Sequence, residues 1–370
     1  MSNPTTATAL QFAEGRLLEA APHGSGHIND TFAVRLAAPG GDRRLILQRI
    51  NTAVFPDPGA LMENILRVTE HLRRKMGGRP DLQRRVLRVV RTREGAPFHR
   101  DGEGRVWRAY EFIEGARTFD TLGAPGQIAE AARAFGAFLA QLADLPGPPL
   151  AEVIPRFHDG ARRYRLFQEA VSADACNRAA GCAPEIAYAE SQAPRFELVP
   201  RLLEAGALPV RVTHNDTKIN NVLLDEGTGE ALCVIDLDTA MPGVSLYDFG
   251  DIVRTTASRA AEDEADLSRI RVEMERFEAI ARGYLRGAGE CLGADEKAHL
   301  AFGGGLMALI IGLRFLTDHL AGDRYFKIHQ EGHNLRRARA QFALARSLQQ
   351  HEQAMAGLIE RLETQPREAP

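Results

Sequence analysis

The feature that most constrains the fold of this chain is a change of sequence pattern near residue 114. Before that point, runs rich in valine, isoleucine, leucine and phenylalanine are separated by turns, and one helical pattern begins at P-D-P-G-A-L after the third run. After it, most of the chain repeats apolar residues at helical spacing. We therefore expect an α+β fold with a small β-rich N-lobe over residues 1–114 and a large, mainly helical C-lobe over residues 115–370.

One short stretch of the helical half has a different pattern. Residues 220–238 contain two strand-like runs, N-N-V-L-L-D and A-L-C-V-I-D-L-D, joined by the turn E-G-T-G-E. Charged and amide residues gather at both ends of this predicted hairpin. Functional side chains are therefore expected there first.

The charge balance narrows the range of partners. The chain of 370 residues has 46 basic and 49 acidic residues, a formal net charge of −3, with 44% hydrophobic and 26% charged residues. This is the composition of an ordinary globular protein, and the balance argues against a dedicated nucleic-acid or anionic-membrane surface. We expect a small-molecule substrate, with neither nucleic acid nor membrane as a partner.

Other features bear on localisation. The first residues have no basic region and no long apolar core, so we expect no secretory signal. The longest uncharged apolar run, Leu300–Leu313, falls short of the ~20 residues of a membrane-spanning helix and predicts a buried core helix. None of the four cysteines forms a C-x-x-C pair, which favours reduced thiols. We expect a cytoplasmic protein.

The most informative stretch is V-T-H-N-D-T-K-I-N-N-V-L-L-D at 212–225, followed by V-I-D-L-D at 234–238. Asn221 lies five residues after Asp216, and Asp236 lies fifteen residues after Asn221. Phosphoryl transfer requires these residue types, because one carboxylate positions the attacking hydroxyl while an amide oxygen and a second carboxylate hold Mg²⁺ against the phosphates. Each residue alone would usually be a turn or strand-end residue. Together, in this order, they predict a phosphotransferase site.

The motifs H-N-D-T-K-I-N-N and I-D-L-D resemble those of the aminoglycoside phosphotransferase and choline kinase superfamily, which has a protein-kinase-like fold. With G-S-G-H-I-N-D-T-F and V-I-D-L-D-T-A-M-P-G, the sequence more narrowly resembles the N-acetylhexosamine 1-kinases. The resemblance implies that Asp216 is the catalytic aspartate and that Asn221 and Asp236 are magnesium ligands, assisted by Asp238.

Three other residues are expected to support Asp216. Lys218, two residues after the aspartate, is expected to steady the γ-phosphoryl group during catalysis. The resemblance implies that Asp248 caps and orders the catalytic loop. His214 is expected to anchor the same loop by hydrogen bonds.

The expected phosphate-binding loop contains Gly24, Ser25 and Gly26, where backbone N–H groups can face phosphate oxygens. The G-x-G-x-x-G pattern is incomplete, because Asn29 stands at the third glycine position. A G-x-G alone is more often a simple turn, and it is the downstream catalytic motif that favours a phosphate-binding role.

Kinases hold the ATP phosphates with a lysine on the third strand, but the run R-L-I-L-Q-R-I contains none. Arg49 is the expected replacement, as in choline kinases, and a surface arginine on an edge strand is the alternative. Glu63 of the following helix, in preference to Glu70, is its expected ion-pair partner. In R-A-Y-E-F-I-E-G, the resemblance implies that Glu111 and Ile113 offer backbone groups to adenine; an ordinary buried strand is compatible with this.

The acceptor site is expected to involve Arg314, which lies in a very apolar helix, and Tyr325, eleven residues later. A charge in that setting needs a partner, so an internal salt bridge is the alternative. The N-acetylhexosamine 1-kinases look alike in placing an arginine and a tyrosine of this segment near the sugar, and by the same resemblance His27 completes the site.

These observations predict an enzyme that uses ATP and Mg²⁺ to phosphorylate a sugar hydroxyl, namely the anomeric C1 hydroxyl of an N-acetylhexosamine. A kinase of an amino alcohol, an aminoglycoside or another small metabolite is the first alternative. Such kinases cage a cation with acids and aromatic rings, and only one tryptophan and six tyrosines are available. A catalytically silent nucleotide-binding protein is the second alternative.

Overall fold

The computed structural model describes residues 6–24, 26, 28–38 and 40–364. The chain folds into two compact units, which are described separately. The first unit contains Met1–Thr118, Asp144–Pro155 and Val222–Met241, and the second contains Phe119–Ala143, Arg156–Asn221 and Pro242–Pro370. One unit is rich in strands and the other is mainly helical, which confirms the predicted fold class. A lobe boundary at residue 114 stays a prediction.

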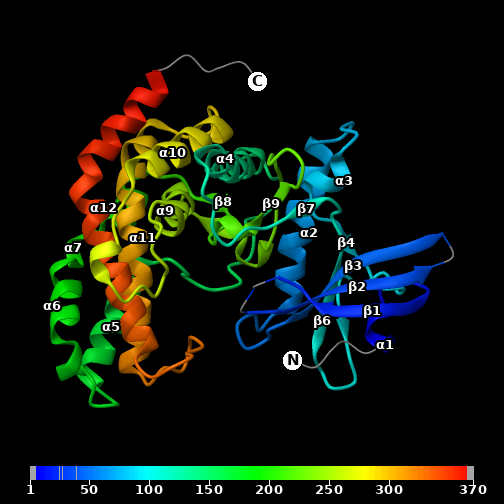
Figure 1. Cartoon of the computed structure of the whole chain (residues 1–370), viewed down its shortest axis with the longest axis horizontal. Helices are drawn as coiled ribbons and strands as arrows, with labels where there is room; N and C mark the ends of the chain where they lie inside the picture. Colours follow the sequence, from blue (N-terminus) through cyan, green and yellow to red (C-terminus); the bar gives the residue numbers. More distant parts are fainter. Residues whose placement is uncertain (1–5, 25, 27, 39, 365–370) are drawn as a thin grey trace. The chain divides into compact units, whose positions relative to one another are not determined.

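The first unit is built on an antiparallel sheet with the strand order β1-β2-β3-β6-β4 (Figure 1). In β2, Phe32, Val34 and Leu36 are buried and alternate with more exposed residues, as expected for a strand with one face on a core. The inner strand β6 is buried over most of its length. The strands are β1 (Arg16–Pro22), β2 (Asp30–Ala38), β3 (Gly41–Ile50), β4 (Val89–Val90), β5 (His99–Arg100), which pairs with β6, and β6 (Val106–Glu111).

The predicted helix after the third strand is α2 (Pro58–Lys75). It starts where expected, because the Asp57 carboxylate accepts a hydrogen bond from the Ala60 N–H at 3.0 Å and proline occupies the first turn. Its last turn is basic, which suits the negative end of the helix dipole. Its buried Asn64 donates to the carbonyl of Ala240 at 3.2 Å, so α2 holds the chain just after Asp238.

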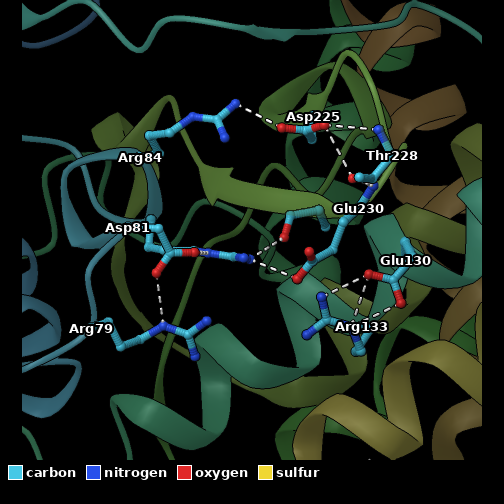
Figure 2. Close-up of polar contacts among 10 residues, drawn as sticks. Arg79, Asp81, Arg84, Glu130, Arg133, Asp225, Thr228 and Glu230 are labelled. Atoms are coloured by element: carbon cyan, nitrogen blue, oxygen red, sulfur yellow. Dashed lines mark hydrogen bonds and ion pairs between the residues drawn. The ribbon is translucent and has the colours of Figure 1, made fainter.

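The predicted polar hairpin is formed by β9 (Val222–Asp225) and β10 (Ala231–Val234), and β9 also pairs with β7 (Ala116–Arg117). The hairpin belongs to the first unit, although helices precede and follow it in the sequence. The short helix α3 (Leu82–Arg85) supplies two arginines that hold it (Figure 2): Arg84 contacts Asp225 at 2.8 Å, and Arg85 contacts Glu230 at 2.9 Å.

The second unit is a set of packed helices. Close approach of α4 to α10 depends on glycine: a Cβ added to Gly283 would lie 2.0 Å from the carbonyl oxygen of Ala129. The helices are α4 (Pro125–Gln141), α5 (Gly160–Ala173), α6 (Ala183–Ser191), α7 (Ala193–Phe196), α8 (Leu198–Glu204), α9 (Ser245–Thr256), α10 (Met274–Ala288), α11 (Ala294–Leu320) and α12 (His333–Thr364). Short elements complete the chain: α1 (Thr6–Ala9), η1 (Ala179–Cys182), β8 (Arg211–Thr213), η2 (Ile219–Asn221), η3 (Leu237–Thr239), β11 (Met241–Gly243) and η4 (Leu267–Arg269).

Helix α11 contains the long apolar run noted in the sequence and packs along α12 (Figure 1). It extends beyond that run, and by length and composition alone it could cross a membrane. However, 94% of its most apolar stretch is buried inside the protein. The prediction of a buried core helix is therefore confirmed.

Candidate active site

The loop that follows β8 carries Asp216, and a buried carboxylate orders it. Asp248, near the start of α9, accepts hydrogen bonds from the N–H of His214 at 2.9 Å and from the N–H of Asn215 at 2.7 Å. Its own carbonyl accepts from the Thr217 hydroxyl at 2.6 Å. Burial raises the pKa of Asp248 to about 7. These contacts confirm the expected ordering role of Asp248.

Asp216 lies among polar partners from its own loop. The Lys218 Nζ is 2.9 Å from one carboxylate oxygen, and Asn221 Nδ2 donates to the other at 3.0 Å. The Asp216 N–H donates to His214 Nδ1 at 3.2 Å, which confirms that His214 anchors the loop. Burial opposes ionisation, but Lys218, His214 and Asn221 outweigh it and lower the pKa of Asp216 to about 2. The neighbouring carboxylate in turn raises the pKa of Lys218. Both side chains are therefore charged at neutral pH.

Asn221 is oriented so that its carbonyl oxygen is left for a ligand. Its Nδ2 donates to the Asp216 carbonyl at 2.8 Å as well as to the carboxylate, and no described residue donates to its Oδ1. Asp236 follows β10 in the first unit and adopts a positive φ of 58°, which is uncommon for a residue with a side chain. An amide oxygen and a carboxylate suit Mg²⁺. No group of three His, Cys, Asp or Glu side chains within the described ranges could hold a metal by itself.

Asp238 has two close partners within the first unit. Its carboxylate pairs with Arg108 at 2.5 Å and accepts from Asn29 Nδ2 at 2.6 Å. Asn29 Oδ1 also accepts from the N–H of Asn51 at 2.9 Å, so this side chain connects the glycine-containing loop to the end of β3. Asn29, which stands at the third glycine position, thus links the glycine-containing loop to Asp238 and Asn51. Arg108 was not predicted from the sequence, although a charged residue inside an apolar strand was a signal for it.

The glycine-containing loop is described in part. Gly24 has a φ of +76°, which favours glycine, and a Cβ at Gly24 or Gly26 would meet nothing within 4 Å. These positions leave space beside the backbone, as a loop that approaches phosphate would need. Ser25 and His27 lie outside the described residues, so their expected roles stay predictions.

The expected pair between Arg49 and Glu63 does not form. The Arg49 guanidinium instead pairs with Asp30, and the side chain of Glu63 is exposed, with no ion-pair partner among the residues that the structure describes. The reason is the sheet register: Asp30 and Arg49 are directly opposite each other on β2 and β3, and opposite charges at such positions attract.

The segment expected to bind adenine leaves the sheet after β6. The Glu111 N–H donates to the carbonyl of Arg88 at 3.0 Å, and its side chain pairs with Arg43 at 2.5 Å. The N–H of Phe112 makes the last contact to β3 at 3.2 Å. Within the described chain, the N–H of Ile113 has no acceptor, so the donor expected to meet adenine is available.

The expected acceptor residues meet in an aromatic cluster of the second unit. The Arg314 guanidinium carbon lies 5.0 Å from the ring centre of Phe157, 5.7 Å from that of Tyr325 and 5.4 Å from that of Phe326. Arg314 forms no ion pair with a described residue, so the internal salt bridge is not found. Burial lowers the pKa of Arg314, and Tyr325 opposes that shift.

The segment that carries Tyr325 is fixed by a residue that the sequence did not single out. The Asp318 carboxylate accepts hydrogen bonds from the N–H groups of Arg324, Tyr325 and Phe326, at 2.8 to 2.9 Å. Tyr325 itself is 57% exposed. Phe157 and Phe326 were missed as well, because neither lies near a motif.

Comparisons with known proteins bear on the family and the fold of the chain. A profile of the phosphotransferase enzyme family matches residues 19–290. The chain is similar to the aminoglycoside phosphotransferase from Alicyclobacillus acidocaldarius, with 15% identity, a TM-score of 0.58 and coverage of 98% of this chain and 97% of that one. It is also similar to a spectinomycin phosphotransferase in complex with ADP and spectinomycin (12% identity, TM-score 0.55, coverage 90% and 93%) and to choline kinase from Cryptosporidium parvum (16%, 0.53, 94% and 93%).

At such low identities the solved structures show the fold, and they confirm that it is protein-kinase-like. The family profile shows membership of a family, because its match extends over most of the chain. The matched residues include the loop with Asp216 and Asn221 and the hairpin that leads to Asp236. This chain belongs to the phosphotransferase enzyme family.

Proposed function

We propose that this phosphotransferase transfers the γ-phosphoryl group of ATP to the anomeric C1 hydroxyl of an N-acetylhexosamine. The single observation that carries the choice of acceptor is Arg314. Its guanidinium occupies the space between Phe157, Tyr325 and Phe326, and it forms no ion pair with a described carboxylate, although the charge of Asp216 acts on it from a distance. A neutral, hydroxyl-rich acceptor can accept hydrogen bonds from such a group.

The same observation argues against the alternative acceptors. Sites for amino alcohols and aminoglycosides hold a cation against acids and aromatic faces. Here the aromatic faces are occupied by the protein's own cation, which would repel a positively charged ligand. The second arginine nearby, Arg163, donates to the carbonyl of Phe157 at 2.8 Å and adds to the positive charge.

The proposed chemistry follows from the charge state of the loop. With a pKa of about 2, Asp216 is a weak base, so it is suited to orient the acceptor hydroxyl and to take its proton only as the phosphorus–oxygen bond forms. Lys218 stays charged and balances the phosphoryl group. Asn221 and Asp236 would hold Mg²⁺, which supplies charge neutralisation at the β- and γ-phosphates when it is bound.

On the nucleotide side, we assign the phosphates to the loop of Gly24, Ser25 and Gly26 and to Arg49, and the adenine to the backbone of Glu111 and Ile113. What supports this assignment is the positive φ of Gly24 and the unused N–H of Ile113. The presence of ADP in the spectinomycin phosphotransferase agrees with ATP as the donor. His27, Arg314 and Tyr325 would contact the sugar.

The test is an ATP-turnover assay with phosphorus NMR of the product. N-acetylglucosamine and N-acetylgalactosamine should be phosphorylated, whereas their 1-O-methyl glycosides, choline, ethanolamine and spectinomycin should not. Reaction of a methyl glycoside would show that another hydroxyl is used, and reaction of choline or spectinomycin alone would favour the alternative acceptors. Absence of turnover with every acceptor would favour the catalytically silent protein.

Arg314→Ala should impair sugar use far more than it impairs ATP binding. Arg346→Ala is the matched control, because Arg346 also lies over an aromatic ring of the second unit, 4.2 Å from the ring centre of Tyr188, but has no proposed role in the site. A folded Arg314→Ala protein with normal sugar kinetics would contradict the acceptor assignment.

A further inference from the structure

A buried histidine without a role so far, His158, contacts the catalytic loop. It lies just before α5 and is 5% exposed, with its ring packed against Phe157 at 4.3 Å and Tyr247 at 5.4 Å between ring centres. Its Nε2 donates a hydrogen bond to the backbone carbonyl of Asn215 at 2.8 Å. His158 is thus tied to the residue that immediately precedes Asp216.

Asn215 is held at both of its backbone polar groups. Its N–H donates to the Asp248 carboxylate at 2.7 Å, and its C=O accepts from His158. Its φ of +62° belongs to the left-handed region, which costs a residue with a side chain roughly 1–3 kcal/mol and persists only where the surroundings impose it. The peptide that joins Asn215 to Asp216 is held at both of its polar groups, because its C=O accepts from His158 and its N–H, that of Asp216, donates to His214 Nδ1 at 3.2 Å. These two contacts fix the direction in which Asp216 leaves the backbone.

The surroundings of His158 indicate a fixed, neutral donor. Burial lowers its pKa to about 3, and the nearby cations Arg314 and Arg163 favour the same direction, against the opposing influence of the Asn215 carbonyl and of Asp216. Among the described residues, its Nδ1 has no hydrogen-bond partner, so no described side chain is placed to pass a proton through the ring. A neutral imidazole with one bonded nitrogen can hold a carbonyl but cannot relay protons.

We propose that His158 is a positioning residue that fixes the Asn215–Asp216 peptide and thereby aims the Asp216 carboxylate at the acceptor hydroxyl. This inference rests on the proposed role of Asp216. It assigns no contact with substrate to His158 itself, and it explains why a polar ring is kept in an aromatic environment.

Three variants test the inference. His158→Phe keeps the ring and removes the donor, and His158→Gln restores an N–H donor at a similar reach. His333→Phe is the matched control, because His333 is another buried histidine of the second unit, 3% exposed and bonded to Asp263 at 3.0 Å, outside the proposed site. We expect His158→Phe to lower kcat by ~10–100-fold with the KM for ATP nearly unchanged, since misplacement of a reacting group by about 1 Å costs up to that much.

Further readouts separate positioning from a purely structural or a catalytic role. The kcat ratio of wild type to His158→Phe should stay constant from pH 6.5 to 9, because the ring does not titrate there. His158→Gln should recover most of the rate, and His333→Phe should retain full kcat even if its melting temperature falls. A kcat for His158→Phe within two-fold of wild type, or a loss that follows histidine ionisation, would overturn the proposal.

Amide hydrogen exchange provides a readout that needs no acceptor. Exchange in a peptide covering residues 211–222 should become faster in His158→Phe and return toward wild type in His158→Gln, with little change in His333→Phe. Unchanged exchange would overturn the proposal even if wild type phosphorylates no sugar, a result that by itself would contradict only the proposed function.

Discussion

The two segments that carry the proposed catalytic carboxylates are held in place by different kinds of interaction. In the second unit, the loop with Asp216 is fixed by hydrogen bonds between its backbone and buried side chains: Asp248 accepts from two N–H groups, and His158 donates to a carbonyl. In the first unit, the hairpin that leads to Asp236 is fixed by ion pairs to α3, whose side chains are partly exposed (Figure 2). The residue proposed to orient the acceptor is thus held by buried hydrogen bonds, whereas the hairpin before the proposed magnesium ligand is held by partly exposed ion pairs.

This difference has a physical consequence. Exposed ion pairs contribute little each, about 0–1 kcal/mol, and salt screens them within a Debye length of ~8 Å at physiological ionic strength. Buried hydrogen bonds are not screened, and a buried N–H that loses its acceptor costs roughly 1–3 kcal/mol. Substitution and pH should therefore change the activity and stability that depend on the loop. Ionic strength should instead change how firmly the hairpin is held.

The largest expected effect is on the loop. Asp216→Asn removes the carboxylate that is proposed to orient the hydroxyl and take its proton, and loss of such a group typically costs ~10²–10⁴-fold in kcat. ATP binding, measured by calorimetry, should persist. A kcat within a few-fold of wild type on an accepted sugar would remove Asp216 from this role.

The corresponding change in the hairpin is Asp236→Ala. Since loss of a residue that merely supports a metal ligand costs ~10–100-fold in affinity, loss of a ligand itself should weaken Mg²⁺-dependent nucleotide binding by at least that much. Titration of nucleotide at several magnesium concentrations measures this. Equal affinity and an unchanged magnesium dependence in the variant would exclude the ligand role.

A smaller expected effect is the pH dependence of stability that His158 gives to the loop. The pKa of His158 is about 3 in the folded protein and ordinarily about 6.5 in an unfolded chain, so below pH 6.5 the unfolded state binds more protons. Above pH 6.5, protonation of His158 does not reduce the free energy of unfolding. As the pH falls from 6.5 toward 3, the free energy of unfolding decreases, and at pH 5 the decrease is about 2 kcal/mol. Urea unfolding at pH 7.5 and 5 should therefore show wild type losing about 2 kcal/mol more than His158→Phe. Parallel losses would mean that His158 is not held neutral.

The smallest effect concerns the arginine contacts of the hairpin. Arg84→Leu should raise the magnesium concentration needed for half-maximal activity by up to ~5-fold at low salt, with little further effect of added salt, because a partly exposed pair contributes on the order of 1 kcal/mol. Arg91→Leu is the control, since Arg91 forms an exposed pair with Glu70 at 3.7 Å, away from the hairpin. If both variants behave alike, the ion pair with Asp225 does not position Asp236.

Sequence motifs predicted the residues that are close in the chain. The loop after β8 has Asp216, Lys218 and Asn221 within six consecutive residues, and this short spacing predicts that their side chains meet. The helix α2 and its cap were also predictable, because proline and aspartate signals are local. Arg49 shows the limit of such reasoning: its partner, Asp30, is set by the register of two strands, which no local pattern specifies.

The remaining parts of the site depend on tertiary packing. Arg108 lies opposite Gln48 and reaches Asp238 only because β6 and the segment after β10 are brought together. Three further residues belong to no motif. Phe157 contacts Arg314, His158 donates to the Asn215 carbonyl, and Asp318 accepts from the N–H of Tyr325. Such residues become visible only in the folded chain.

The most direct test of the proposed reaction asks which oxygen receives the phosphoryl group. N-acetylglucosamine labelled with ¹³C at carbon 1 should be incubated with ATP, Mg²⁺ and the protein, and the phosphorus NMR spectrum of the product recorded. If the C1 hydroxyl attacks the γ-phosphorus, the product signal will be split by coupling to the labelled carbon, and Asp216→Asn will form that product far more slowly. A phosphorylated sugar whose phosphorus signal shows no coupling to carbon 1 would contradict the account.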